Sequence, residues 1–294
     1  MRLQRTFVHA TLLTFAAAGV LSAQVTFKTT GYEIRDALGD VVHIWVSPFK
    51  SEKRDWVGVL GVAATAGALL PLDDNIDSWI VRHPNAAIVR ATIPWNEDHP
   101  EFGDLSTGQR LLPISGVLIA SGMVSGNRKL REAGWGCLTA WQSSSTIREV
   151  LYATVSRERP SLDNHDQYAV KTPGDEWDYH SFFGGHAANA FACTTFWNTR
   201  FHMGLLEPVL YASAAGIALS RMADRRHWAT DTWVGVAAGY AMGRSISARY
   251  ARREAKREQR KLESEPIRAS FLEGLQVAPA RGGGLAFTWS GQFR

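Results

Sequence analysis

The stretch SRMADRRHWATD, residues 220–231, places an arginine, a histidine and an aspartate just before a long apolar run. Its fixed points are Ser220, Arg221, His227 and Asp231. His227 and Asp231 stand four residues apart, so on a helix they would share one face. The carboxylate could then accept the proton of one imidazole nitrogen and leave the other nitrogen free to attack. Since the same spacing also fits a surface pair, its meaning depends on what lies upstream.

Two upstream segments carry groups that suit an anion. Gly184 and Gly185 precede His186 and the helix-like run AANAFACTTFW. Unblocked amides at a helix N-terminus can receive an anion, and glycine permits its close approach. Further back, Arg159 followed by Pro160 places a guanidinium where a helix ends. Each feature alone also has a structural explanation, as a glycine turn or a common helix end.

Taken in order, the three segments resemble a known superfamily. RERP, GGH and SR-x5-H-x3-D follow the order and spacing of K-x6-R-P, P-S-G-H and S-R-x5-H-x3-D, the motifs of the type 2 phosphatidic acid phosphatase superfamily. That superfamily includes bacterial class A acid phosphatases and vanadium haloperoxidases. The resemblance covers about residues 111–248, and the third motif matches at every fixed position. It implies an all-α fold, a helical bundle with the site at helix ends.

The resemblance also implies a role for each matched residue. His227 would be the nucleophile that forms a phosphohistidine, and Asp231 would orient it. His186 would protonate the departing alkoxide and then activate water. The phosphate-binding residues would be Arg159, Arg221, Gly184, Gly185 and Ser220. No metal or other cofactor is required, because arginines and amides neutralise the charge.

Two of the motifs are incomplete in this chain. Tyr152 stands where the first motif has lysine, and Phe183 and Gly184 stand where the second has proline and serine. One phosphate-binding cation and one hydroxyl donor are therefore missing. Gly184 could still offer its amide, and Arg157 or Lys171 could replace the lost charge.

The N-terminus has the features of an export signal. A basic start, MRLQR, is followed by an apolar run over residues 10–21 and a Ser-Ala pair. We expect residues 1–23 to be a cleaved signal peptide, with an uncleaved membrane anchor as the alternative. The working part would then lie in the periplasm or at the periplasmic face of the cell envelope. Cys137 and Cys193, the only cysteines, could pair there or remain buried free thiols.

Two uncharged segments, residues 57–72 and 111–126, raise the question of a membrane. Each is near the lower limit of about 17 to 25 residues for a bilayer-spanning helix, so a buried core helix is an equal alternative. Residues 127–155 predict a helix with too many polar groups to face lipid. We therefore favour a soluble or peripherally attached bundle over a fully embedded one.

The rest of the chain divides by composition. We expect a lead-in with the first core helix over residues 24–110, the catalytic core over 111–248, and a basic tail over 249–294. β-branched and aromatic residues between 25 and 49, broken by glycines, predict short strands or an irregular lead-in rather than a long helix. A Pro-Ala-Arg-Gly-Gly-Gly turn predicts a terminal hairpin after a charged helix. The polar stretch over residues 160–182 predicts a loop that walls a pocket.

The formal net charge of +4 gives no sign of a nucleic-acid partner. Basic residues concentrate in the tail, between Arg249 and Arg268, where they alternate with glutamates as on a solvated helix. After Asp231, Gly235, Gly239 and Gly243 repeat every four residues. They predict a small-residue face that packs closely on a neighbouring helix.

Together these patterns predict an exported phosphatase that hydrolyses a phosphate monoester or a lipid (di)phosphate, with a membrane surface as a further partner. The alternative is a phosphate-binding envelope protein of the same fold that turns over poorly, because Tyr152 and Gly184 depart from the motifs. Vanadium-dependent halide oxidation is disfavoured by the missing lysine. A metallohydrolase is the least supported reading, because among the histidines and acids only His227 and Asp231 have ligand spacing.

Overall fold

The computed structural model describes residues 29–50, 52–96, 107–162, 164–171, 177–273, 275–279 and 285–289. The predicted signal peptide, residues 1–23, lies outside the described residues.

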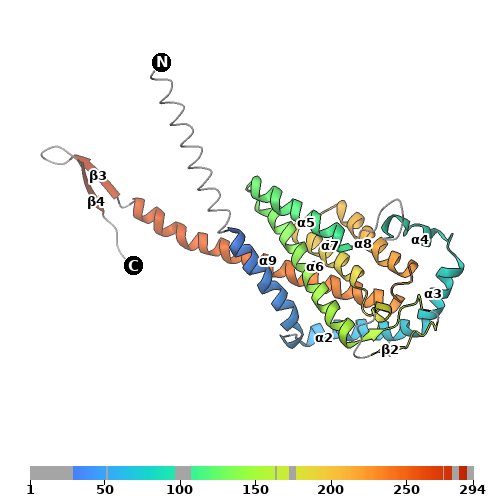
Figure 1. Ribbon diagram of the computed structural model, residues 1–294. Coiled ribbons are helices and arrows are strands. Elements are labelled where there is room, and N and C mark those ends of the chain that lie inside the picture. Colours follow the sequence, from blue (N-terminus) through green and yellow to red (C-terminus); the bar gives the residue numbers. More distant parts are fainter. Residues whose placement is uncertain are drawn as a thin grey trace, which may run out of the picture. The chain divides into compact units, whose positions relative to one another are not determined.

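Helices account for most of the described chain, which confirms the all-α class (Figure 1). Residues 29–46 are helical, and the further α-helices are α2 (Lys53–Leu69), α3 (Asp73–Arg82), α4 (Ala87–Arg90), α5 (Thr107–Val124), α6 (Arg128–Thr154), α7 (Gly185–Phe201), α8 (Leu206–Ala223) and α9 (Ala229–Glu273). Short 3-10 turns connect them: η1 (Ser47–Lys50), η2 (Leu70–Leu72), η3 (Ile93–Trp95) and η4 (Trp177–Tyr179).

Two small antiparallel ribbons complete the described structure. β1 (Ser156–Arg157) pairs with β2 (Val170–Lys171). The stretch predicted as a polar loop, residues 160–182, is therefore hydrogen-bonded through β2 to the residues just before it. β3 (Leu275–Pro279) pairs with β4 (Leu285–Trp289), with Leu275 opposite Trp289. The second ribbon is the hairpin that the tail pattern predicts.

The short strands predicted between residues 25 and 49 do not form in the part of that range that the structure describes, since residues 29–46 are helical and η1 follows them. One face of this helix is fixed by tertiary contacts. Glu33 accepts hydrogen bonds from Arg131 Nε at 2.8 Å and from Trp135 Nε1 at 3.0 Å, and Asp40 and Ile44 are buried. These contacts recur at helical spacing and outweigh the β preference of the intervening residues.

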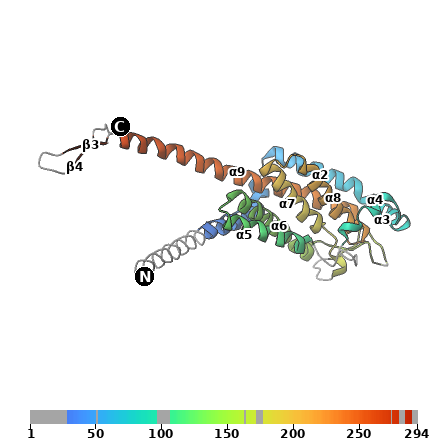
Figure 2. The same cartoon turned by 90° about the horizontal axis from the view of Figure 1, so that it is seen from above.

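The bundle is built around α6 and α7. α5 packs on α6, α6 on α7, and α7 on α8, and both views show these helices side by side (Figures 1 and 2). The many polar residues of α6 are partly explained by this position, because Ser143, Ser144 and Ser145 are buried. Cys137 of α6 and Cys193 of α7 form a disulfide, which decides between the two alternatives for the cysteines.

The first part of α9 lies directly against the backbone of α7. A Cβ at Gly239 would lie 2.3 Å from the carbonyl oxygen of Ala188, and one at Gly235 would lie 2.3 Å from that of Gly184. At Gly243 the corresponding distance to Ala192 O is 2.5 Å. The predicted small-residue face is confirmed, and it brings the start of α9 to the N-terminus of α7.

α2 is not the buried core helix that was one alternative for residues 57–72. The helical stretch Asp55–Arg82 is long and apolar enough to cross a membrane, and none of its most apolar window is buried. In the described part of the chain it is the one helix that meets this condition. It is joined to the bundle by a hydrogen bond from Trp233 Nε1 to Thr65 Oγ1 at 2.8 Å.

The chain forms two compact units that meet within α9, between Ser247 and Ala248. The first unit holds the helices described above. The second consists of the remainder of α9 and the β3–β4 hairpin.

The close approach of α7 and α9 makes a stability prediction. Gly239→Ala should destabilise the protein by about 1 to 3 kcal/mol, because the new methyl meets backbone that must move. Gly61→Ala on α2 is the matched control: its Cβ meets nothing within 4 Å, so it should be neutral or stabilising by up to about 1 kcal/mol. Denaturant unfolding of both variants measures the difference, and equal effects would contradict the packing described.

Candidate active site

Four segments that are separate in the sequence meet at the N-terminus of α7. Arg159 follows β1, His186 lies in the first turn of α7, Arg221 lies in the last turn of α8, and His227 lies in the loop before α9. The rings of His186 and His227 have centroids 6.2 Å apart. The two predicted catalytic histidines therefore face a common space.

His227 is held in one defined tautomer by the backbone. Its Nδ1 lies 2.7 Å from the carbonyl oxygen of Ser181, and the side chain is 3% exposed. A carbonyl can only accept a hydrogen bond, so Nδ1 must carry the proton. Nε2 is left with a lone pair, which is the form that a nucleophile needs.

Asp231 supports His227 indirectly, which differs from the expected direct pair. His227 precedes α9, so the two residues do not share a helical face. Asp231 Oδ2 instead accepts from the Ser181 hydroxyl at 2.6 Å and from the Trp228 amide at 3.3 Å. Ser181 thus joins the pair: its hydroxyl donates to Asp231, and its carbonyl accepts from His227.

Arg157 is committed to two buried carboxylates and not to a phosphate. Its Nη1 donates to Asp231 Oδ1 at 2.7 Å and its Nη2 to Asp73 Oδ2 at 2.8 Å. Asp73 also accepts from the Thr230 amide at 2.9 Å. The suggestion that Arg157 replaces the motif lysine is therefore wrong. Lys171, the other candidate, is exposed on β2, with Nζ 5.4 Å from the centre of the Tyr179 ring.

Arg159 is a buried cation with unused donors. It is 3% exposed, its Nη2 donates to His180 O at 3.3 Å, and its guanidinium lies 4.0 Å from the centre of the Trp177 ring. Its Nε and Nη1 are buried and have no hydrogen-bond partner. Burial lowers the pKa of Arg159 to about 10, so it remains charged at neutral pH. Buried donors of this kind are costly unless an acceptor binds, which fits an anion site.

Two further residues predicted to bind phosphate, Arg221 and Ser220, differ in their surroundings. Arg221 is 5% exposed and donates to Asp224 Oδ2 at 3.3 Å. The Ser220 hydroxyl lies 2.8 Å from Ile217 O and 3.2 Å from Trp95 O, so it joins α8 to η3 and does not face the histidines.

The Gly184 amide is also used within the fold, because it donates to Asp231 O at 2.9 Å. A Cβ at Gly184 would lie 3.0 Å from Asp231 O and from Thr232 Cα, so there is little room here for the family's serine. Gly185 begins α7, and amides in the first turn of a helix have no intrahelical acceptor. Gly185 therefore stays a predicted phosphate-binding residue, whereas the amide of Gly184 is already bonded within the fold.

Part of the chain matches a known protein family. Residues 133–255 match the model of the PAP2 superfamily. This part of the chain is a PAP2-superfamily domain. The match spans all three motif segments, RERP, GGH and SR-x5-H-x3-D.

One solved structure is similar to the chain: the crystal structure of the first transmembrane PAP2 type phosphatidylglycerolphosphate phosphatase from Bacillus subtilis. The identity is 17%, the match covers 65% of this chain and 93% of that one, and the TM-score is 0.43. None of the curated proteins compared with the chain matches it.

The electrostatics of the PAP2 site keep both histidines neutral. Burial, followed by the charges of Arg159 and Arg221, holds the pKa of His227 well below its usual value. Burial and Arg221 do the same to the pKa of His186. Burial raises the pKa of Asp231, and Arg157 opposes this shift. The histidines thus lie in a positive field that an anionic substrate would neutralise.

Arg148 is a charged residue of the PAP2 site that the sequence motifs did not identify. It lies on α6, and its charge adds to the lowering of both histidine pKa values. For His186 it follows burial, Arg221 and His227 in size, and for His227 it follows burial, Arg159 and Arg221. The available signal was its position four residues before Tyr152, since residues so spaced share a helical face.

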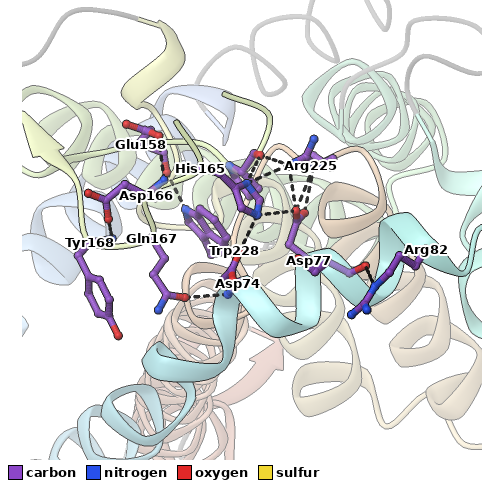
Figure 3. A network of polar contacts seen from close by, with 12 residues as sticks. Asp74, Asp77, Arg82, Glu158, His165, Asp166, Gln167, Tyr168, Arg225 and Trp228 are labelled. Atoms are coloured by element: carbon purple, nitrogen blue, oxygen red, sulfur yellow. Dashed lines mark hydrogen bonds and ion pairs between the residues drawn. The ribbon is translucent and has the colours of Figure 1, made fainter. Parts of the chain in front are cut away.

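A polar network outside the catalytic centre fixes the loops of the PAP2 site (Figure 3). His165 Nε2 lies 2.7 Å from Asp74 Oδ1, and Arg225 Nη2 lies 3.0 Å from Asp77 Oδ2. His165 Nδ1 also lies 3.0 Å from the carbonyl oxygen of Pro160. α3 is thereby joined to the segments that carry Arg159 and His227. A pocket of about 560 Å³ beside this network is lined by Asp77, His165 and Arg225, and neither His186 nor His227 lines it.

The buried neutral state of His227 makes stability depend on pH. Its pKa is lowered in the folded protein, whereas the unfolded chain has the ordinary value of about 6.5. Below about pH 6.5 the unfolded chain therefore binds more protons than the folded protein. As the pH falls further, this residue lowers the free energy of unfolding by up to about 1.4 kcal/mol for each pH unit. His227→Asn should reduce that slope. We base the prediction on His227 because His186 is less deeply buried.

Urea unfolding at pH 7.5, 6.5 and 5.5 measures the slope. His202→Asn is the matched control, because His202 is exposed and has a positive φ, which asparagine tolerates. The control should leave the slope unchanged. A wild-type slope equal to that of His227→Asn would contradict the neutral, buried state of this histidine.

Proposed function

We propose that the protein is a phosphatase that transfers a phosphoryl group to Nε2 of His227 and then to water. Its PAP2-superfamily domain supports phosphatase-type activity in general. The observation that carries the specific mechanism is the fixed tautomer of His227, with Nδ1 bonded to Ser181 O. The His227 ring lies beside that of His186, with centroids 6.2 Å apart, and its pKa is lowered by the charge of Arg159, a cation with two unused buried donors.

In the first step Nε2 of His227 attacks the phosphorus atom and forms a P–N bond. The P–O bond to the leaving group breaks on the opposite side, and His186 donates a proton to the departing alkoxide. Because His186 is neutral in the ligand-free site, it acquires this proton when the substrate's negative charge raises its pKa. Arg159 and Arg221 neutralise the non-bridging oxygens as charge moves.

In the second step water attacks the phosphohistidine. His186, which is now neutral, takes a proton from the water as the P–N bond breaks, and orthophosphate leaves. The net reaction is hydrolysis of a phosphate ester to an alcohol and phosphate. Ser181 O holds Nδ1–H throughout, so the same ring nitrogen is presented in each cycle.

We further propose that the enzyme is exported and acts on a phosphate monoester or lipid (di)phosphate at a membrane surface. The N-terminal sequence pattern and the Cys137–Cys193 disulfide support an oxidising compartment. The outward-facing apolar side chains of α2 support contact with lipid, among them Val57 at 69% and Leu60 at 66% exposed.

The mechanism predicts different effects for the two histidines. His227→Asn should lose on the order of 10³ to 10⁶ in kcat for any phosphate ester, because the nucleophile is absent. His186→Asn should lose as much with an alkyl phosphate but less with p-nitrophenyl phosphate, whose leaving group needs no proton. Phosphate release from both substrates measures this, with His202→Asn as the control that keeps full activity.

Full activity of either active-site variant would contradict the mechanism. A wild-type protein that binds orthophosphate but hydrolyses no ester between pH 4 and 9 would instead support the poorly active binding protein.

A further inference from the structure

We infer that Arg148 of α6 is a third phosphate-binding guanidinium of the site, in the role of the motif lysine whose position Tyr152 occupies. This inference rests on the proposed function of the site. It names the cation that the sequence left unassigned.

The side chain of Arg148 crosses the N-terminus of α7. A Cβ built on Gly185 would lie 2.4 Å from Arg148 Cδ and 3.1 Å from Arg148 Cγ, so the stem passes directly over this glycine and would have to shift for any larger residue. Gly185 is the first residue of α7, and His186 is the second. Arg148 therefore reaches the place where the first-turn amides and the general acid would meet a phosphate.

Tyr152 cannot supply the missing charge. It is 8% exposed and stacks on His180, with ring centroids 4.4 Å apart and an interplanar angle of 10°. Burial raises the pKa of Tyr152, so it is neutral at physiological pH. The guanidinium of Arg148 lies 5.8 Å from the centre of its ring. Arg148 thus lies one helical turn before the position of the motif lysine on α6. Its side chain extends past the Tyr152 ring to the N-terminus of α7.

The resting partner of Arg148 is easily exchanged. Nε and Nη2 both donate to Glu149 Oε1, at 3.1 and 2.5 Å. Glu149 is 64% exposed and Arg148 is 23% exposed, and ion pairs so open to water contribute little stability. A bound phosphate offers the guanidinium a bidentate acceptor in a more enclosed place, where charge-assisted bonds are stronger.

The test measures oxyanion binding to the full-length protein. Calorimetry gives the affinity for orthophosphate, and inhibition gives the affinity for orthovanadate. Arg148→Gln should weaken binding of both by about ten- to a hundredfold and raise KM more than it lowers kcat. Arg148→Lys should recover most of the affinity, because it restores the charge.

Arg244→Gln is the matched control. Arg244 also lies 5.8 Å from a tyrosine ring four residues earlier, that of Tyr240, but it is exposed and about 20 Å along α9 from Asp231. Its substitution should leave affinity unchanged. Thermal unfolding shows whether each variant is folded.

The outcomes separate this inference from the proposed function. Loss of phosphate affinity in Arg148→Gln, with recovery in Arg148→Lys, supports the inference even if the wild type hydrolyses no ester. Unchanged affinity and KM in a folded Arg148→Gln variant overturn it while hydrolysis by the wild type stands. A wild type that binds neither oxyanion overturns both.

Discussion

The site depends on one buried ion triad, in which Arg157 lies between Asp73 and Asp231. Both carboxylates are essentially inaccessible to water, and the guanidinium bonds to each at less than 3 Å. The triad joins the first residue of α3, the strand after α6 and the first turn of α9. Removing one partner of such a group leaves an uncompensated buried charge and typically costs about 3 to 5 kcal/mol. The catalytic segments are therefore held together by charge as well as by packing.

The position of His227 follows from this triad. Asp231, fixed by Arg157, binds the Ser181 hydroxyl, and the Ser181 carbonyl binds Nδ1 of His227. Asp231 is thus linked to the imidazole of His227 through two hydrogen bonds, both of them made by Ser181. Its negative charge is balanced by Arg157, which leaves Arg159, Arg221 and Arg148 to act on the space between the histidines. A dianionic phosphoryl group is the ligand that such a field favours.

Motif spacing could indicate which residues stand near one another, because each motif lies at a helix end. His186, His227, Arg159 and Arg221 are brought together as the three motifs imply. It failed where the outcome depends on contacts between helices. Ser220 matches the third motif, and Gly184 stands where the second motif has serine. The Ser220 hydroxyl and the Gly184 amide nevertheless form hydrogen bonds within the fold. The spacing of Arg148 and Tyr152 places them on one face of α6, but the contact of Arg148 with Gly185 depends on how α6 meets α7.

The same limit applies to the fold. The glycine face of α9 could be predicted because a repeat of four residues is a property of one helix. Whether Cys137 and Cys193 pair could not be predicted, because pairing depends on how α6 meets α7. The local pattern of residues 29–46 predicts short strands or an irregular lead-in and not a helix, because the partners that stabilise the helix, Arg131 and Trp135, lie about a hundred residues away. Local preference is a weak guide where long-range contacts decide.

The central claim is that Nε2 of His227 is the atom that bonds to phosphorus. A crystal structure of the protein with orthovanadate tests it most directly, because vanadate adopts the trigonal bipyramidal geometry of phosphoryl transfer. The account predicts vanadium bonded to Nε2, with Nδ1 still on Ser181 O and the oxyanion held by Arg159 and Arg221. Vanadate bound elsewhere, or bound here without a bond to His227, would contradict it.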